Sequence, residues 1–333
     1  RFQQEASSNI METMLQQKQL LVWAVCGAGK TEMLFEGLTA CFEKGLRVCL
    51  ATPRADVVRE LIPRFQQAFP NVSMCALYGG TPDKDEGVQF VISTTHQLLR
   101  YKDAFDVMII DEVDAFPYYA DQSLSFAANR ARKEKGSLIF LTATPRGTLK
   151  WRAQLGVIPT TFVPARYHGH PLPVPQFQAC FSLNKALRKN QLPQEVTSWI
   201  EKKRKEKRRF LLFVPTIAMA EQVSAITKIE HVHASDANRM EKVEQFRRKE
   251  MDAFITTTIL ERGVTFPSID VAILDAGHQV FDEAALVQIA GRAGRNAQDP
   301  FGEVIFFHQG KSNAMVKARK MINRMNQLAR RTS

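Results

Sequence analysis

Cysteine is scarce in this chain, and its spacing excludes two kinds of site. The five cysteines are Cys26, Cys41, Cys49, Cys75 and Cys180, and no two of them have the C-x-x-C spacing of zinc or redox motifs. Most stand in apolar stretches. We therefore expect small buried side chains in a reducing compartment and no disulfide framework.

Long apolar runs are also missing. No stretch approaches the roughly 18–20 residues that a membrane-spanning helix needs, and we find no signal peptide. The sequence starts at Arg1 and not at Met, which leaves room for an upstream segment. We expect a cytoplasmic protein without a membrane span of its own.

Basic residues outnumber acidic ones. The 333 residues include 45 Lys and Arg against 34 Asp and Glu, which gives a net charge of +11. A polyanion is a reasonable partner for that charge. A soluble basic protein without such a partner would carry it too, so charge alone does not separate the two.

Short apolar runs alternate with amphipathic segments in the first half. Continuous runs of leucine and β-branched residues are typical of parallel strands covered on both faces. Strands that alternate with helices predict a parallel α/β sheet. The expected strands lie near 21–25, 47–52, 89–94, 107–111 and 137–144, with helices near 31–45 and 54–69.

Proline then interrupts the pattern. Residues 151–177 contain five prolines, which disfavour helix and favour an extended linker. Strand-like runs resume at 209–216, 252–258, 270–276 and 302–308. We predict two α/β domains, residues 1–164 and 177–333, joined by a proline-rich linker over 165–176.

The loop AVCGAGKT follows an apolar strand and precedes a helical segment, as a phosphate-binding loop does. Backbone N–H groups of Gly27, Ala28 and Gly29 would face the phosphates of ATP, and Lys30 would reach the outer ones. The Thr31 hydroxyl would ligate Mg²⁺. A tight turn without a ligand is the alternative.

The apolar run VMIID leads into three acids, at Asp111, Glu112 and Asp114. In this type of sheet such a strand end lies beside the phosphate loop. Asp111 would hold Mg²⁺, and Glu112 would orient and deprotonate the attacking water. A solvated acidic turn is the alternative.

The segment QIAGRAGR places Arg292 and Arg295 three residues apart, on one face if the segment is helical. Two such arginines could stabilise the charge that develops on the γ-phosphate. A basic helix cap or a surface patch is the alternative.

Together and in this order, these segments resemble the motifs of the superfamily 2 helicases and translocases. The resemblance covers nearly the whole chain and implies two tandem RecA-like domains, each a parallel sheet flanked by helices, with a nucleotide cleft between them. The matching segments are AVCGAGKT, LATPR, LYGG, ISTTHQLL, DEVD, LTATP, LLFVPT, TTTILERGVTFP and QIAGRAGR.

Within that superfamily, LVWAVCGAGKTEMLF, IIDEVDAFPYY and LVQIAGRAGR are similar to the competence ATPases of naturally transformable Gram-positive bacteria. Their motor resembles that of the helicase PriA. The resemblance implies an ATPase, stimulated by single-stranded DNA, that helps import transforming DNA at the inner face of the cell membrane. It also implies ComFC-like and ComEC-like partners, and it leaves the oligomeric state open.

The resemblance assigns further roles, with two departures. Gln3 would read adenine, unless it is merely a solvated helix residue. Thr265 stands where many related motors have aspartate, so no ribose contact is carried over to it. These ATPases usually have a four-cysteine zinc module ahead of the motor, and this chain has no such cluster, so zinc is not expected.

In motors of this kind each domain holds half of the active site. Gln288 would join Arg292 and Arg295 on the second domain, so that hydrolysis requires domain closure. Asp114 would link the Mg²⁺ site to LTATP or to QIAGRAGR. Thr142 and Thr144 would couple nucleotide state to the DNA face, or would simply cap a strand end.

Single-stranded DNA would be held through its backbone by small hydroxyls, backbone N–H groups and arginine. The candidates are Thr52, Arg54, Gly80 and Thr95 in the first domain and Thr257 and Thr258 in the second. The basic run 201–209 is interpreted as a solvated helix end, with a polyanion patch as the alternative.

Two other functions remain open. One is a duplex-unwinding helicase of the PriA or RecG kind, although we identify no wedge module in the sequence. The other is a nucleotide-switched DNA-binding scaffold without useful turnover, which the combination of Glu112, Arg292 and Arg295 disfavours.

Overall fold

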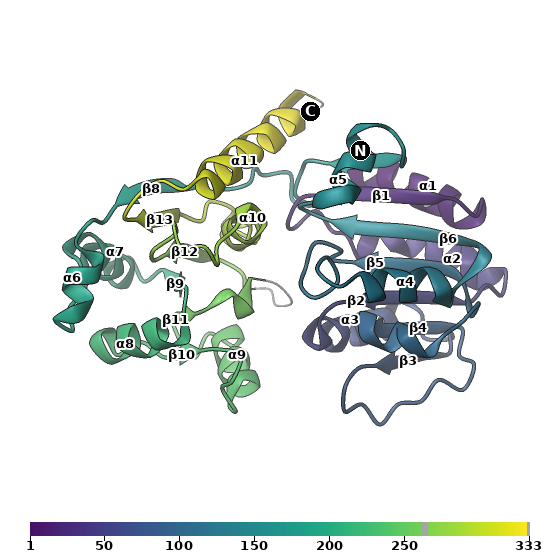
Figure 1. Ribbon diagram of the computed structural model, residues 1–333, viewed down its shortest axis with the longest axis horizontal. Helices are drawn as coiled ribbons and strands as arrows, with labels where there is room; N and C mark the ends of the chain where they lie inside the picture. Colours follow the sequence, from purple (N-terminus) through teal and green to yellow (C-terminus); the bar gives the residue numbers. More distant parts are fainter. Residues whose placement is uncertain (262–265, 332–333) are drawn as a thin grey trace. The chain divides into compact units, whose positions relative to one another are not determined.

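A computed structural model describes residues 1–261 and 266–331 of the chain. The chain divides into two compact units, Arg1–Tyr167 and His168–Ser333. Each unit is a parallel sheet flanked by helices (Figure 1). The predicted fold class is confirmed.

The first unit has a seven-stranded sheet in the order β3-β4-β2-β5-β6-β1-β7, and every pairing is parallel. The strands are β1 (Gln19–Ala24), β2 (Val48–Thr52), β3 (Met74–Leu77), β4 (Phe90–Thr94), β5 (Phe105–Asp111), β6 (Arg132–Thr142) and β7 (Thr160–Val163). The helices are α1 (Phe2–Leu15), η1 (Glu32–Leu34), α2 (Phe35–Glu43), α3 (Ala55–Ala68), η2 (Thr95–Arg100), α4 (Gln122–Ala131) and α5 (Gly147–Gln154).

The second unit has a six-stranded parallel sheet in the order β10-β11-β9-β12-β13-β8. Its strands are β8 (Gln176–Ala179), β9 (Arg209–Phe213), β10 (His231–Val232), β11 (Ala253–Thr256), β12 (Ile269–Ile273) and β13 (Val304–His308). Its helices are α6 (Leu183–Arg188), α7 (Gln194–Lys205), α8 (Ile217–Thr227), α9 (Arg239–Arg247), η3 (Thr258–Leu260), α10 (Glu283–Ala290) and α11 (Asn313–Arg331).

The central strands are apolar along their whole length because both faces of the sheet are covered. Strands β2 and β4 are buried at every residue. Helix α4 packs Leu124 and Ala128 into the core that contains Met108 and Ile110 of β5. Parallel strands point in one direction, so β1, β2, β4, β5 and β6 all end at the same edge of the sheet, where the motif residues stand.

The short edge elements were not predicted. Strands β3, β7, β8 and β10 are only two to four residues long, too short for an alternating pattern to be recognised. The helix expected over 31–45 begins with the 3-10 turn η1 and continues as α2 to Glu43, with Gly45 in the left-handed region at φ +67°.

Candidate active site

The phosphate-loop segment connects β1 to η1. Gly27 and Gly29 both have φ of +79°, a backbone conformation that side chains disfavour. The Ala28 amide donates to the Val25 carbonyl at 3.1 Å, and the Met33 amide donates to the Gly29 carbonyl at 3.1 Å. The two glycines therefore allow a compact turn directly after a buried strand, with Lys30 and Thr31 between that turn and η1.

Asp111 is the last residue of β5 and meets both a charge and a neighbouring amide. Burial raises the pKa of Asp111 to about 6, and the negative charge of Glu112 adds to that rise, while the positive charge of Lys30 lowers it. The Glu112 amide donates to Asp111 Oδ1 at 2.8 Å. The structure thus brings Lys30 and Asp111 within electrostatic range of each other.

Glu112 follows in the left-handed region, at φ +53°. Its Oε2 atom is buried and has no hydrogen-bond partner among the described residues. Burial of a carboxylate oxygen removes its hydrogen bonds to water, and without a protein partner nothing offsets that loss of free energy. A bound water molecule would supply the missing hydrogen bond to Oε2. The role expected for Glu112, orienting the attacking water, requires a water at this position.

Asp114 is buried at the end of the acidic cluster, with 1% of its surface exposed. Thr142 Oγ1 donates to Asp114 Oδ1 at 2.5 Å, and Thr144 Oγ1 donates to the other carboxylate oxygen. The Thr144 amide in turn donates to Thr142 Oγ1 at 3.0 Å. The structure brings together all three residues to which a coupling role was assigned, and the partner of Asp114 is the LTATP segment.

Strand β1 also contacts the LTATP segment, and nothing in the sequence indicated this contact. Trp23 lies on β1, just before the phosphate loop, and its Nε1 donates to the Ala143 carbonyl at 3.0 Å. Ala143 stands between the two threonines that bind Asp114. A buried indole N–H needs an acceptor, but the sequence does not show which carbonyl provides it.

A pocket of about 460 Å³ lies beside the phosphate loop within the first unit. Gln3 of α1 lines it, and Gln3 Nε2 donates to the Ala165 carbonyl at 3.4 Å. Tyr167 lines it as well, with its side chain 75% exposed and its amide donating to the Gly27 carbonyl at 2.8 Å. Nothing in the proline-rich segment singled out Tyr167, because the loop it meets lies 140 residues earlier.

In the second unit, α10 ends at Ala290, so the arginines of QIAGRAGR do not share a helical face. They lie in the turns that follow. Arg292 is buried, and its Nε donates to the Glu261 carbonyl at 3.0 Å. Arg295 Nε donates to the Gly291 carbonyl at 2.8 Å. Gln288, on α10, is buried as well.

Gly294 occupies a crowded position in the turn that follows α10. Gly294 has φ +61°, and a Cβ at this position would lie 2.1 Å from the Pro300 carbonyl oxygen. No side chain fits there. The turn that carries the arginines is therefore packed directly against the backbone that follows it.

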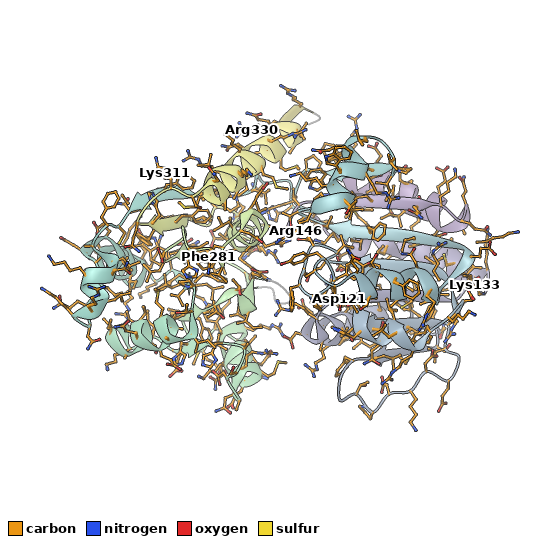
Figure 2. The ribbon with its side chains drawn as sticks, in the orientation of Figure 1. Asp121, Lys133, Arg146, Phe281, Lys311 and Arg330 are labelled. Carbon is orange, nitrogen blue, oxygen red and sulfur yellow. The ribbon has the colours of Figure 1, made fainter. Side chains whose placement is uncertain are left out.

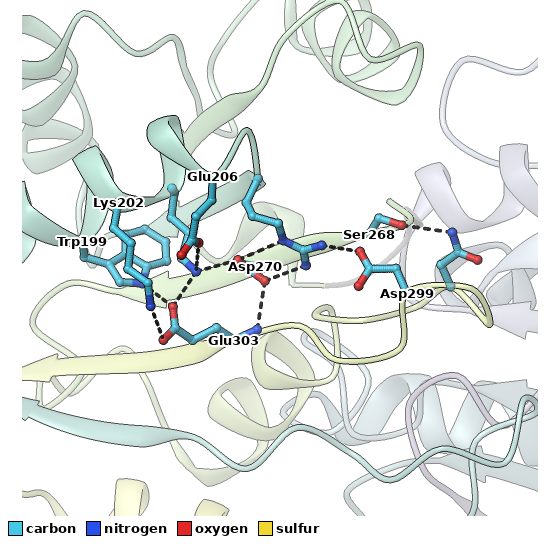
Figure 3. A network of polar contacts seen from close by, with 10 residues as sticks. Trp199, Lys202, Glu206, Ser268, Asp270, Asp299 and Glu303 are labelled. Atoms are coloured by element: carbon cyan, nitrogen blue, oxygen red, sulfur yellow. Dashed lines mark hydrogen bonds and ion pairs between the residues drawn. The ribbon is translucent and has the colours of Figure 1, made fainter.

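An ionic network with Lys203 and Asp270 buried at its centre includes the segment that follows this turn (Figure 3). Lys203 Nζ lies 2.8 Å from Asp270 Oδ2 and 2.7 Å from Glu303 Oε2. Arg208 contacts Asp270 at 3.0 Å and also binds Asp299. These contacts tie the end of α7 to the start of β12 and to the segment after the arginines. The basic run 201–209 is thus only partly a solvated helix end.

The nucleic-acid candidates fall into two groups. Thr52 ends β2 and Thr95 follows β4, its neighbour in the sheet, but both side chains are fully buried. Arg54 precedes α3 and lies 3.8 Å from Asp56. The exposed candidate is Gly80, at φ +81°.

Thr257 and Thr258 lie partly buried at the start of η3 in the second unit. Thr265 lies outside the described residues. The DNA-contact roles of all these residues remain predictions.

Exposed aromatic side chains follow the acidic strand end, and sequence reasoning gave them no role. Phe116 is 70% and Tyr119 49% exposed. The Arg146 guanidinium carbon lies 4.6 Å from the centre of the Tyr119 ring (Arg146 is labelled in Figure 2). Tyr119, Arg146 and Arg152 line a pocket of about 380 Å³ in the first unit.

Among the described helices, none is long and apolar enough to cross a membrane.

Two family models match the chain. "Type III restriction enzyme, res subunit" matches residues 1–147, and "Helicase conserved C-terminal domain" matches residues 188–297. Competence protein ComFA of Bacillus subtilis is 52% identical over 332 residues, covering 98% of this chain and 72% of that protein. Competence protein ComFA of Streptococcus pneumoniae is 41% identical over 335 residues, covering 98% of this chain and 77% of that protein.

Solved structures share the architecture at low identity. Dbp5 of S. cerevisiae, bound to RNA and ADP BeF3, matches with a TM-score of 0.69 at 16% identity, covering 95% of this chain and 86% of that chain. The Mycobacterium smegmatis helicase Lhr, bound to ssDNA and AMP-PNP, matches with a TM-score of 0.68 at 17% identity, covering 97% of this chain and 48% of that chain. These likenesses concern the fold, which is that of tandem RecA-like domains.

Proposed function

Because the chain belongs to the ComFA family of competence proteins, within helicase superfamily 2, we propose that it hydrolyses ATP in response to single-stranded DNA and moves a DNA strand during natural competence. Membership of the family supports the competence-associated ATPase. The response to DNA and the movement of a strand are the proposed steps beyond it.

The observation that carries the proposal is the buried link from Asp114 to Thr142 and Thr144. Asp114 stands three residues after Asp111, the candidate Mg²⁺ ligand. A change at the nucleotide can therefore pass through a buried, fully hydrogen-bonded carboxylate to the end of another strand.

Lys30, Thr31 and Asp111 would hold ATP together with Mg²⁺. When bound, Mg²⁺ would neutralise phosphate charge and orient the phosphates for in-line attack. Hydroxyl and carboxylate oxygens are ligands suited to Mg²⁺, and the raised pKa of Asp111 reflects a burial that a bound cation would offset. Glu112 would take the proton of the attacking water through its buried carboxylate.

Arg292 and Arg295 would supply positive charge to the γ-phosphate as the bond to it breaks, with Gln288 nearby on α10. Each arginine is anchored through Nε to a backbone carbonyl. Such anchoring fixes the orientation of the guanidinium before the reaction. A charge that is already oriented stabilises the transition state without first having to reorganise.

Gln3 and Tyr167 would bind the adenine base in the pocket beside the phosphate loop. The pocket opens on Gly29, where the phosphates would begin. An exposed aromatic ring offers a stacking face, and a side-chain amide can pair with the adenine edge. We propose that these two residues select ATP over other nucleotides.

Single-stranded DNA would contact Phe116 and Tyr119 as well as the phosphate-binding candidates. Exposed aromatic rings accept stacked bases of any sequence, and arginine close to the ring adds a phosphate contact. The net charge of +11 favours a polyanion. Because the Thr52 and Thr95 hydroxyls are buried, contact there would go through the backbone at these strand ends.

We further propose that the protein acts at the inner face of the cell membrane with ComFC-like and ComEC-like partners. This part of the proposal rests on the resemblance to competence ATPases. Its test is co-purification of the chain with either partner, compared with the Glu112→Gln variant.

The ATPase rate tests the main proposal. We expect single-stranded DNA to accelerate hydrolysis well beyond duplex DNA of the same length. Hydrolysis that DNA fails to accelerate would instead indicate a nucleotide-switched scaffold. Efficient displacement of a strand from a forked duplex by this chain alone would indicate a duplex-unwinding helicase.

A further inference from the structure

Three side chains of the types that bind transition metals meet in the second unit, apart from every residue assigned to ATP or DNA. Glu221 comes from α8, His231 from β10, and His233 from the segment directly after β10. One ligating atom of each residue lies within 4.8 Å of those of the other two.

The fold produces this arrangement at the edge of the sheet. Strand β10 is the edge strand and pairs only with β11, with His231 opposite Ile255. His231 lies on β10 and His233 directly follows it, and the backbone brings their two rings together. Their ring centres are 5.6 Å apart with 23° between the planes. Helix α8 precedes β10 and packs against it, which brings Glu221 alongside.

An unpaired nitrogen of His233 is a second observation that points to a bound ligand. Its Nδ1 atom is buried and has no hydrogen-bond partner in the part of the chain that the structure describes. A buried imidazole nitrogen normally donates or accepts a hydrogen bond, because leaving it unpaired costs its desolvation. Coordination of a cation by this histidine would compensate for that burial.

The charges around the three residues permit a cation. Lys242 is the nearby positive group, and its Nζ donates to the His231 carbonyl at 3.1 Å. Its charge is balanced by Asp236 at 2.9 Å and Glu230 at 3.4 Å. Glu221 therefore contributes a negative charge to a region that is already close to neutral.

We propose that Glu221, His231 and His233 bind a divalent transition-metal ion, with Zn²⁺ as the first candidate. Two imidazoles and one carboxylate form a ligand set for Zn²⁺ and its neighbours in the first transition row. The hard cation Mg²⁺, by contrast, takes oxygen ligands. A fourth position is left for water or for a group of a bound partner. The ion fastens α8 to β10 and so shields a short edge strand from unwanted pairing.

The ligands need only a small adjustment to close on an ion. Metal–ligand bonds of about 2.0–2.2 Å place neighbouring ligand atoms roughly 3.3 Å apart. Glu221 is exposed and can change rotamer, whereas His231 is held on the edge strand and His233 directly follows it. The site is independent of cysteine, so it is separate from any four-cysteine zinc module.

The test is metal binding by the untagged chain after chelator treatment, without nucleotide. We expect one equivalent of Zn²⁺ to bind in competition with a chromogenic chelator, and one equivalent of Co²⁺ to produce d–d absorption. Zn²⁺ should also raise the melting temperature of the second unit. The double variant His231→Ala/His233→Ala should lose at least about tenfold in affinity.

Two further variants make the result decisive. Glu221→Gln changes only an exposed side chain, so it should fold normally yet lose most of the Zn²⁺-induced rise in melting temperature. His96→Ala, an exposed histidine of the first unit, should bind Zn²⁺ like the parent chain. Binding weaker than about 100 µM in the parent, or equal binding in the parent and in Glu221→Gln, would overturn the proposal.

Discussion

Thr142 Oγ1 donates a 2.5 Å hydrogen bond to Asp114 Oδ1, and this bond joins the acidic end of β5 to the end of β6. Thr144 completes the contact on the second carboxylate oxygen. Asp114 is therefore held by the end of β6, three residues after Asp111, the candidate Mg²⁺ ligand at the end of β5. Loss of either hydrogen bond would leave a buried carboxylate oxygen without a partner, which costs free energy.

The first prediction concerns this link. Thr142→Val keeps the side-chain shape and removes the donor, so the ratio of DNA-stimulated to unstimulated ATP hydrolysis should fall by about fivefold or more. The measurement is the steady-state rate with and without single-stranded DNA. Thr39→Val, on the exposed side of α2, is the matched control. An unchanged ratio in Thr142→Val would show that the bond serves only to cap the strand.

The second prediction concerns Glu112. Glu112→Gln cannot accept a proton from water, so kcat for ATP should fall by about 10²–10⁴-fold, while ATP still binds because Lys30 and Thr31 are intact. The measurements are the hydrolysis rate and binding of a fluorescent nucleotide. Glu43→Gln, at the exposed end of α2, should match the parent. If Glu112→Gln retained most of its turnover, the general base would be a different residue.

The third prediction concerns the base pocket. Tyr167→Ala should raise KM for ATP by about tenfold, because stacking on an aromatic ring contributes roughly 1–3 kcal/mol, whereas Tyr167→Phe should keep the parent KM. Gln3→Ala should lower the ratio of kcat/KM for ATP to kcat/KM for GTP. Comparison of kcat/KM for the two nucleotides checks both statements. A normal KM in Tyr167→Ala would exclude stacking at this position.

The fourth prediction concerns DNA. Tyr119→Ala should weaken binding of single-stranded DNA by about tenfold, in line with the cost of one lost stack, and Tyr119→Phe should not. Fluorescence anisotropy with a labelled oligonucleotide, repeated at several salt concentrations, separates stacking from phosphate contacts. The salt dependence should be the same in both variants, since neither removes a charge. Equal loss in Tyr119→Phe would point to the hydroxyl and not to the ring.

The fifth prediction concerns the ionic network of the second unit. Burial alone would raise the pKa of Asp270, but hydrogen bonds from Arg208 and Lys203 outweigh it and lower the pKa below its usual 3.8. The stabilisation is therefore fully present above pH 3.8 and is lost as the pH falls from there toward the folded-state pKa. Asp270→Ala should lower the free energy of unfolding at pH 7 by about 3–5 kcal/mol.

Urea unfolding followed by circular dichroism at several pH values checks the fifth prediction. The difference between the parent and Asp270→Ala should shrink below pH 3.8. Glu250→Gln, an exposed acid of the same unit, is the control and should change little. A constant difference across the pH range would mean that charge pairing does not hold the network.

The parts of the fold that are long and periodic could be predicted from the sequence. Strands β2, β4 and β5 are continuous apolar runs, and their buried faces leave little choice of structure. The glycine-rich turn after β1 and the acids at the end of β5 could be located because the chemistry assigned to them requires fixed spacing, and their roles remain predictions. The sequence could not predict which residues far apart in the chain form hydrogen bonds with each other. The contact between Trp23 and the Ala143 carbonyl spans 120 residues.

The arginine turn shows a different limit. Spacing alone suggested one helical face for Arg292 and Arg295, but α10 ends at Ala290, before both arginines. Between the two arginines, Gly294 lies so close to the following backbone that a Cβ there would be 2.1 Å from the Pro300 carbonyl oxygen. Local helical periodicity carries no information about such a backbone approach.

The burial of every cysteine has a practical consequence. Desolvation raises the pKa of Cys41, Cys49 and Cys75 to about 12, so these thiols stay protonated and unreactive near neutral pH. A pair of surface cysteines, one introduced on each unit, could thus carry a donor and an acceptor dye without removal of the native thiols. Energy transfer between the dyes in single molecules would then measure whether the distance between the two units changes during ATP hydrolysis.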